Sequence, residues 1–87
     1  MNITQAPSGI NVVVELSDTV YIGRFGCLQG NRVRLRHAAV YQGTEGEHTE
    51  NIIRKAAKYG VPVQHEDLEF EAKDVRRIRK LGDVPKT

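Results

Sequence analysis

The sequence predicts a mostly β protein: a five-stranded, strongly bent antiparallel barrel with one short α-helix inserted between the third and fourth strands. Apolar and polar residues alternate over residues 11 to 41, which is typical of strands with one buried face. Glycines at 23, 26 and 30 interrupt this stretch, and glycine inside a strand commonly marks a bend or bulge. A single segment with helical spacing follows, and the alternation then resumes.

A chain of 87 residues forms one domain, because it is too short for two independent cores. We expect a flexible N-terminal arm over residues 1–9, one barrel domain over residues 10–81 and a C-terminal tail over residues 82–87. Cys27 is the only cysteine, so no internal disulfide reinforces this small core. Subunit association is therefore the reinforcement that we expect.

The first strand is predicted to be half-buried, because Val12, Val14 and Leu16 share one phase while Asn11 and Glu15 take the other. A polar turn over residues 17–19 ends it. The second strand, residues 20–29, contains Gly23 and Gly26, which predicts a curvature strong enough to serve both halves of a barrel.

Gly30-Asn31 is a hairpin dipeptide that supplies positive φ at little cost. The third strand follows, with Val33 and Leu35 inward and an outward row of arginines: Arg32, Arg34 and Arg36. With Arg24, this row is interpreted either as a track for phosphates or as an ordinary solvated strand face.

Helical spacing over about residues 48–59 predicts one amphipathic helix, which Gly60 and Pro62 end. Glu50 precedes Arg54 by four residues, the supportive order for a helical ion pair. The apolar face is expected to cover Val20, Ile22 or Leu28 of the barrel, or alternatively to bind a partner. That face comprises Ile52, Ile53, Ala56 and Ala57.

A fourth strand is expected from Val63, with a dry face that includes Phe70 and a wet face of Asp67, Glu69 and Glu71. Residues 72–74 turn the chain. Apolar residues spaced by three over residues 75–81 indicate a 3₁₀ turn that runs into a short last strand. Five strands in meander order with a strongly bent second strand are typical of an SH3-like or Sm-like barrel.

Three segments carry a family resemblance: residues 12–18, which end in Leu16-Ser-Asp18, residues 21–25 around Gly23, and residues 33–38, which end in Leu-Arg-His-Ala. They look like the first Sm motif, and residues 75–78 stand for the weaker second motif. The chain resembles the Sm and Sm-like (LSm) small β-barrel family as a divergent member. Residues 42–66 lie outside the family pattern.

This resemblance implies a homo-oligomeric ring in which the fourth strand of one subunit pairs with the fifth strand of its neighbour. The acidic wet face of the fourth strand and the basic fifth strand are complementary, since opposite charges across a strand pair contribute about 0.2–1 kcal/mol each. The interface residues implied are Glu69, Phe70, Glu71, Arg76, Arg77 and Ile78.

The resemblance also implies binding of single-stranded RNA by loops near the pore of the ring. The residues assigned to RNA binding are Asn31, Arg32, His37 and Tyr41. In the second turn, where the family places Asp and Asn, this chain has Gln29-Gly30-Asn31-Arg32, so Asn31 is the positional substitute. Tyr41, at a strand end, is the stacking candidate, whereas Tyr21 and Phe25 have the phase of the interior.

A net charge of +2 does not by itself indicate nucleic acid. Basic residues cluster in the third strand and near the end, so the chain can bind a polyanion or dock on an acidic neighbour. The alternative function is therefore a protein–protein assembly module without nucleic-acid binding, and a weaker alternative is an accessory domain of a larger DNA or phage complex.

No nucleophile–base constellation, carboxylate pair or phosphate loop is evident, so we expect no enzyme, no catalytic residue and no cofactor. His65-Glu66-Asp67 matches no familiar metal-ligand spacing, and no metal is expected. The chain lacks a signal-like start and an apolar run long enough to span a membrane. We therefore expect a cytoplasmic protein without a membrane partner.

Overall fold

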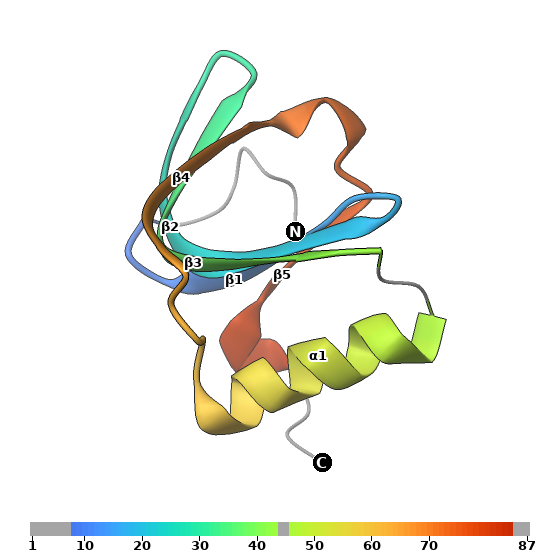
Figure 1. Ribbon diagram of the computed structural model, residues 1–87. Coiled ribbons are helices and arrows are strands. Elements are labelled where there is room, and N and C mark those ends of the chain that lie inside the picture. The colour runs from blue at the N-terminus through green and yellow to red at the C-terminus, as the bar shows by residue number, and fades with distance from the viewer. Residues whose placement is uncertain (1–7, 44–45, 85–87) are drawn as a thin grey trace.

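The computed structural model describes residues 8–43 and 46–84 (Figure 1). It contains one bent antiparallel sheet of five strands in the order β4-β3-β2-β1-β5, which confirms the predicted fold class. The elements in chain order are β1 (Asn11–Glu15), β2 (Thr19–Gln29), β3 (Arg32–Gln42), α1 (Gly46–Tyr59), β4 (His65–Glu71), the 3₁₀ helix η2 (Ala72–Asp74), β5 (Arg77–Lys80) and the 3₁₀ helix η3 (Leu81–Asp83).

Two tight turns set the register of the first three strands. In the turn between β1 and β2, the amide of Leu16 donates to the carbonyl of Thr19 at 2.8 Å. The β2–β3 hairpin has a two-residue loop, since Gln29 pairs with Arg32 and Gly30 adopts a φ of 58°. Both turns lie where the polar and glycine-containing segments predict them.

The sheet bends most sharply where β2 and β3 lose their regular register. The pairing shifts between Ile22 and Arg24, and His37 on β3 takes a φ of 48°. This extra residue turns Ala38 toward Gly23, where an added Cβ would lie 2.7 Å from the Cβ of Ala38. Gly23 is thus required for the close approach of the two strands at the bend, as glycine in a strand often is.

The interior of the barrel holds one of two hydrophobic clusters. Tyr21 of β2 stacks on Phe70 of β4, with ring centroids 3.9 Å apart and planes inclined by 2°. This stack joins two strands that both flank β3, so it stabilises the inward curvature of the sheet. The buried members of this interior cluster are Val12, Val14, Phe25, Val33, Leu35, Ala38, Phe70 and Ile78.

The second cluster lies between the outer face of the sheet and α1, which runs across it in Figure 1. Its buried members are Val13, Val20, Ile22, Ile53, Ala56, Leu81 and Val84. The helix begins at Gly46 rather than near residue 48, and it covers Val20 and Ile22 as predicted. The alternative that the helix covers Leu28 is wrong. The register shift after Phe25 turns Leu28 toward the interior cluster.

The prediction of a half-buried first strand is wrong for the centre of β1. Val12, Val13 and Val14 are all fully buried, because α1 and η3 cover the outer face while the barrel encloses the inner one. The strand therefore has a run of three valines rather than a strict alternation, as strands buried on both faces do.

The hydrophobic core extends closer to the C-terminus than the sequence predicted. We expected a tail from residue 82, whereas Val84 is 3% exposed and packs in the cluster under α1.

Two other boundaries also differ from the prediction or extend it. β4 begins at His65 rather than Val63, and the amide of Gln64, just before this strand, donates to the carbonyl of Ala38 in β3. Of the predicted N-terminal arm, residues 1–7 lie outside the described residues, and the amide of Gly9 donates to the carbonyl of Phe25 at 2.9 Å.

Candidate nucleic-acid interface

The β2–β3 hairpin tip and the turn between β4 and β5 meet at one end of the barrel. The amide of Ala72 donates to the carbonyl of Asn31 at 2.7 Å. The topology requires this meeting. β2 and β4 flank β3 and both run antiparallel to it, so the last residues of β2 and β4 lie at the same end of the sheet, beside the first residues of β3. Arg32 follows Asn31 in the hairpin, and the exposed Lys73 lies in the neighbouring turn.

Lys73 was not among the residues predicted to bind RNA. The strand order could have identified it, because any residue just after the fourth strand of this meander lies beside the second hairpin. The candidate interface at this end of the barrel thus consists of Asn31, Arg32 and Lys73, which we call the hairpin-tip site. An amide and two cations offer base-edge hydrogen bonds and phosphate contacts together.

The outward arginine row on β3 is paired with the acidic row on β4. Arg34 contacts Glu69 at 2.8 Å, and Arg32 contacts the same carboxylate at 3.4 Å. Arg36 lies 3.6 Å from Asp67. These pairs are solvent-exposed and contribute little stability each, but they neutralise most of the row. They favour the interpretation of a solvated strand face over that of a phosphate track.

The four residues predicted to bind RNA do not form one cluster. Asn31 and Arg32 lie together at the hairpin tip, whereas His37 occupies the exposed bulge in the middle of β3. Tyr41 is near the other end of this 11-residue strand, where it packs beside the cluster under α1. Burial raises the pKa of the Tyr41 hydroxyl above its usual value of 10.

The residues predicted for the subunit interface fall into two groups. The side chains of Phe70 and Ile78 point into the barrel core, so only their backbone is open to a neighbour. Glu71 and Arg76 are exposed and make no ion pair with the described residues. Glu69 and Arg77 are already engaged within the chain, so much of the charge that suggested complementarity between subunits is used internally.

Both outer strands of the sheet keep one free backbone edge. Within residues 8–43 and 46–84, β4 pairs only with β3 and β5 pairs only with β1. An unpaired strand edge is a template for pairing with another chain unless it is blocked.

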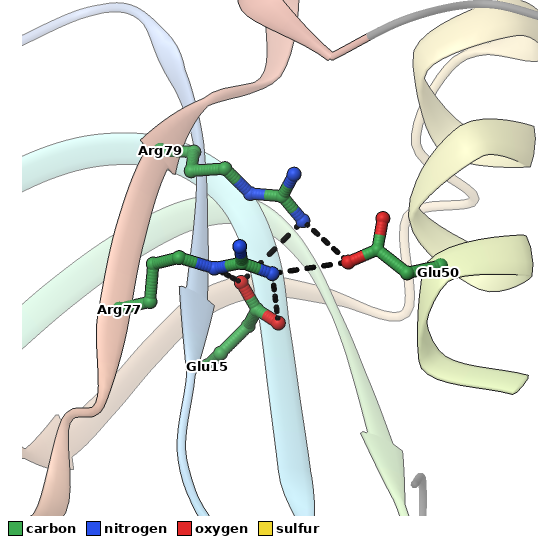
Figure 2. Close-up of polar contacts among 4 residues, drawn as sticks. All are labelled: Glu15, Glu50, Arg77 and Arg79. Carbon is green, nitrogen blue, oxygen red and sulfur yellow. Dashed lines mark hydrogen bonds and ion pairs between the residues drawn. The ribbon is translucent and has the colours of Figure 1, made fainter. Parts of the chain in front are cut away.

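Four charged side chains join α1 to the barrel beside the β5 edge (Figure 2). Arg77 binds Glu15 with two hydrogen bonds of 2.6 and 3.0 Å, and it also donates to Glu50 of α1 at 3.0 Å. Arg79 contacts Glu50 at 3.1 Å and Glu15 at 3.4 Å. The hydrogen bonds that Arg77 donates to the Glu15 carboxylate are the largest cause of the raised pKa of Arg77. We call these four residues the helix-anchoring network.

The sequence suggested a different role for Glu50. A helical pair with Arg54 was the local expectation, but the carboxylate of Glu50 instead binds Arg77 and Arg79 of β5. The docking of α1 on the sheet thus decides the pairing, and sequence spacing alone gives no signal for it.

No helix in the described ranges is long and apolar enough to cross a membrane. Among the same residues, no three His, Cys, Asp or Glu side chains gather in a way that could hold a metal ion.

Comparison with known proteins identifies the fold. No protein-family model matches the chain, and no curated protein matches its sequence. Among solved structures, the chain is similar to an Sm protein of Pyrococcus abyssii in complex with a uridine heptamer. The two share a TM-score of 0.56 and 17% sequence identity over 84% of each chain. This likeness shows an Sm-like fold.

Proposed function

We propose that this chain is a divergent Sm-like protein that assembles into a homo-oligomeric ring and binds single-stranded RNA through loops at the pore. The observation that carries the proposal is the hairpin-tip site, where Asn31, Arg32 and Lys73 come together through the bond between Asn31 and Ala72. The similar Pyrococcus abyssii Sm protein was solved with a uridine heptamer, which supports RNA as the ligand class.

The roles at this site follow from side-chain chemistry. The Asn31 amide both donates and accepts, so it can bond a base edge of an unpaired nucleotide. Lys73 makes no ion pair with the described residues and can offer its charge to a phosphate, whereas Arg32 shares its charge with Glu69. His37 and Tyr41 stay in the proposal as contacts away from the tip, at the bulge and at the far end of β3.

The ring rests on the two free strand edges. We propose that β4 of one subunit pairs with β5 of the next, which would satisfy both edges and leave no open template on the assembly. Backbone hydrogen bonds supply most of this contact. Glu71 is the proposed charged group at this contact, Glu69, Phe70, Arg77 and Ile78 contribute mainly through their backbone, and Arg76 lies at its end, beside the start of β5.

RNA binding is tested with U-rich and A-rich single-stranded oligonucleotides in filter-binding assays over a salt series. We expect Lys73→Gln to weaken binding about 3-fold to 10-fold and to lower the salt slope by about 0.7, since one phosphate contact is lost. Asn31→Ala should change the preference between the two oligonucleotides. Lys55→Gln, on the helix, is the matched control for loss of one lysine charge.

Two results would contradict RNA binding: no detectable complex at micromolar protein, or an affinity that does not change with salt. If Lys73→Gln and Lys55→Gln weaken RNA binding equally, the hairpin-tip site is contradicted. Such a result would indicate a general electrostatic attraction between the protein and RNA.

The second candidate function is a protein–protein assembly module without nucleic-acid binding. Two exposed apolar side chains after and at the end of α1 favour it: Tyr59 is 76% exposed and Val63 is 53% exposed. The internal pairing of the β3 arginines also fits this candidate. It predicts an intact oligomer with no RNA affinity. Under either function the protein has no catalytic role, and the partly buried free thiol of Cys27 fits a reducing, cytoplasmic location.

A further inference from the structure

A cleft of about 810 Å³ lies beside the helix-anchoring network, between the first half of α1, the β1–β2 turn and the start of β5. Arg54 lines it from the helix, and Arg76 and Arg77 line it from the segment before and within β5. Ser17, Thr49 and Asn51 add hydroxyl and amide groups to its wall. The inserted helix α1 supplies one wall of this cleft, and the β1–β2 turn and the start of β5 supply the other.

The charges around the cleft do not cancel. Its two carboxylates, Glu15 and Glu50, are each bound by both Arg77 and Arg79. The remaining cations, Arg54 and Arg76, make no ion pair with the described residues. Two guanidinium groups from separate elements, with neutral hydrogen-bonding groups nearby, are the chemistry that recognises a phosphate group.

The β4–β5 turn connects this cleft with the hairpin-tip site. The turn starts at Ala72, which bonds Asn31, and it ends at Arg76, whose amide donates to the carbonyl of Glu15 at 2.7 Å. Five residues span at most about 18 Å when extended. Lys73 lies between the two ends and is followed by Asp74 and Val75, so cations stand at the tip, early in the turn and at the cleft.

We propose that the cleft binds the sugar–phosphate backbone of an RNA strand that continues from the hairpin-tip site along the β4–β5 turn. Arg54 and Arg76 contact the phosphates, and the inserted helix thereby lengthens the bound segment. The inference rests on the proposed function, because the strand enters from the hairpin-tip site. Phosphodiester is favoured over a protein carboxylate because a strand that leaves the hairpin-tip site meets a second pair of cations at the cleft, no more than about 18 Å of turn away.

The test compares a short U-rich oligonucleotide of about 6 nucleotides with a long one of about 18 nucleotides, a range that spans typical single-strand site sizes. Arg54→Gln should weaken binding of the long RNA about 3-fold to 10-fold, lower its salt slope by about 0.7 and leave the short RNA unchanged. Gln keeps a helix propensity close to that of Arg, so the exposed helix is expected to stay folded. Lys55→Gln, one position further along α1, is the matched control.

Each outcome separates the two proposals. If Lys73→Gln weakens both RNAs and Arg54→Gln weakens neither, the cleft proposal is overturned and the hairpin-tip site stands. If neither RNA binds the unmodified protein, both proposals fail. If Arg54→Gln reduces binding of a polyglutamate peptide but not of long RNA, the cleft takes an acidic protein segment and the RNA track is wrong. Unfolding curves of Arg54→Gln and Lys55→Gln, measured beside the binding data, identify any loss that comes from unfolding.

Discussion

At the scale of single residues, Gly23 carries the bend that gives the sheet its curvature. A Cβ there would meet the Cβ of Ala38 at 2.7 Å and its Cα at 2.9 Å, both closer than van der Waals contact allows. The neighbour is the short Ala38 side chain and its backbone, so no flexible group can move away. The strands must separate at the bend if Gly23 is replaced.

We therefore predict that Gly23→Ala lowers the free energy of unfolding by about 1–3 kcal/mol, the usual range for overpacking a tight site. Urea denaturation measures it. Gly82→Ala is the control, because a Cβ at Gly82 meets nothing within 4 Å. Equal stability of Gly23→Ala and the unmodified protein would show that the bend does not depend on this close approach.

The face of the sheet on which a side chain lies could be predicted from the sequence only where the strands are regular. The inward phase of Val33 and Leu35 follows from strict alternation, and both are fully buried. Leu28 and Ala38 lie beyond register shifts, where the alternation reverses. The positive φ of His37 has no local signal, since the bulge arises from pairing with a distant strand.

At the scale of elements, α1 is held by an apolar face and by the helix-anchoring network at its first half. Glu50 is the network residue that lies on the helix. It contacts Arg77 and Arg79 of β5, and both arginines also contact Glu15 of β1. The Glu50 and Arg79 side chains are only 36% and 23% exposed, so salt screens their contact less than a fully exposed pair. The network thus couples the docking of the helix to the β5 edge.

We predict that Glu50→Gln lowers the free energy of unfolding by about 0.5–1.5 kcal/mol at low salt and by less at 1 M salt, as expected for a partly exposed network. Thermal unfolding at two salt concentrations measures the change. Glu66→Gln is the control, because the exposed Glu66 makes no ion pair with the described residues. A loss that is the same at both salt concentrations would contradict an ionic role for Glu50.

The existence of each element and the meander order of the strands could be predicted from local patterns, but the packing of α1 and of the chain end on the sheet could not. Helical spacing and Gly60 located α1, and Gly60 takes a φ of 93° at its end. The full burial of Val13 and the place of Val84 under the helix depend on tertiary packing that leaves no periodic signal. For the same reason the cleft beside α1 became visible only with the helix and strands in place.

At the scale of the whole molecule, the sheet order β4-β3-β2-β1-β5 explains both the proposed ring and the proposed RNA site. It leaves β4 and β5 as free edges within the described residues, and it brings the hairpin tip beside the β4–β5 turn. The resemblance to the first Sm motif, which includes Gly23 and Leu35, predicted the barrel and its two exposed edges but not the meeting of the hairpin tip with the β4–β5 turn. The RNA residues were harder to predict, since the segments that meet at the tip are distant in sequence.

The most direct test of the central proposal is native mass spectrometry of the protein with and without a U-rich oligonucleotide. We predict one closed homo-oligomer of fixed subunit number in the absence of RNA, and the same oligomer with bound oligonucleotide in its presence. A monomer at micromolar concentration that binds no oligonucleotide would contradict both the ring and its RNA-binding role.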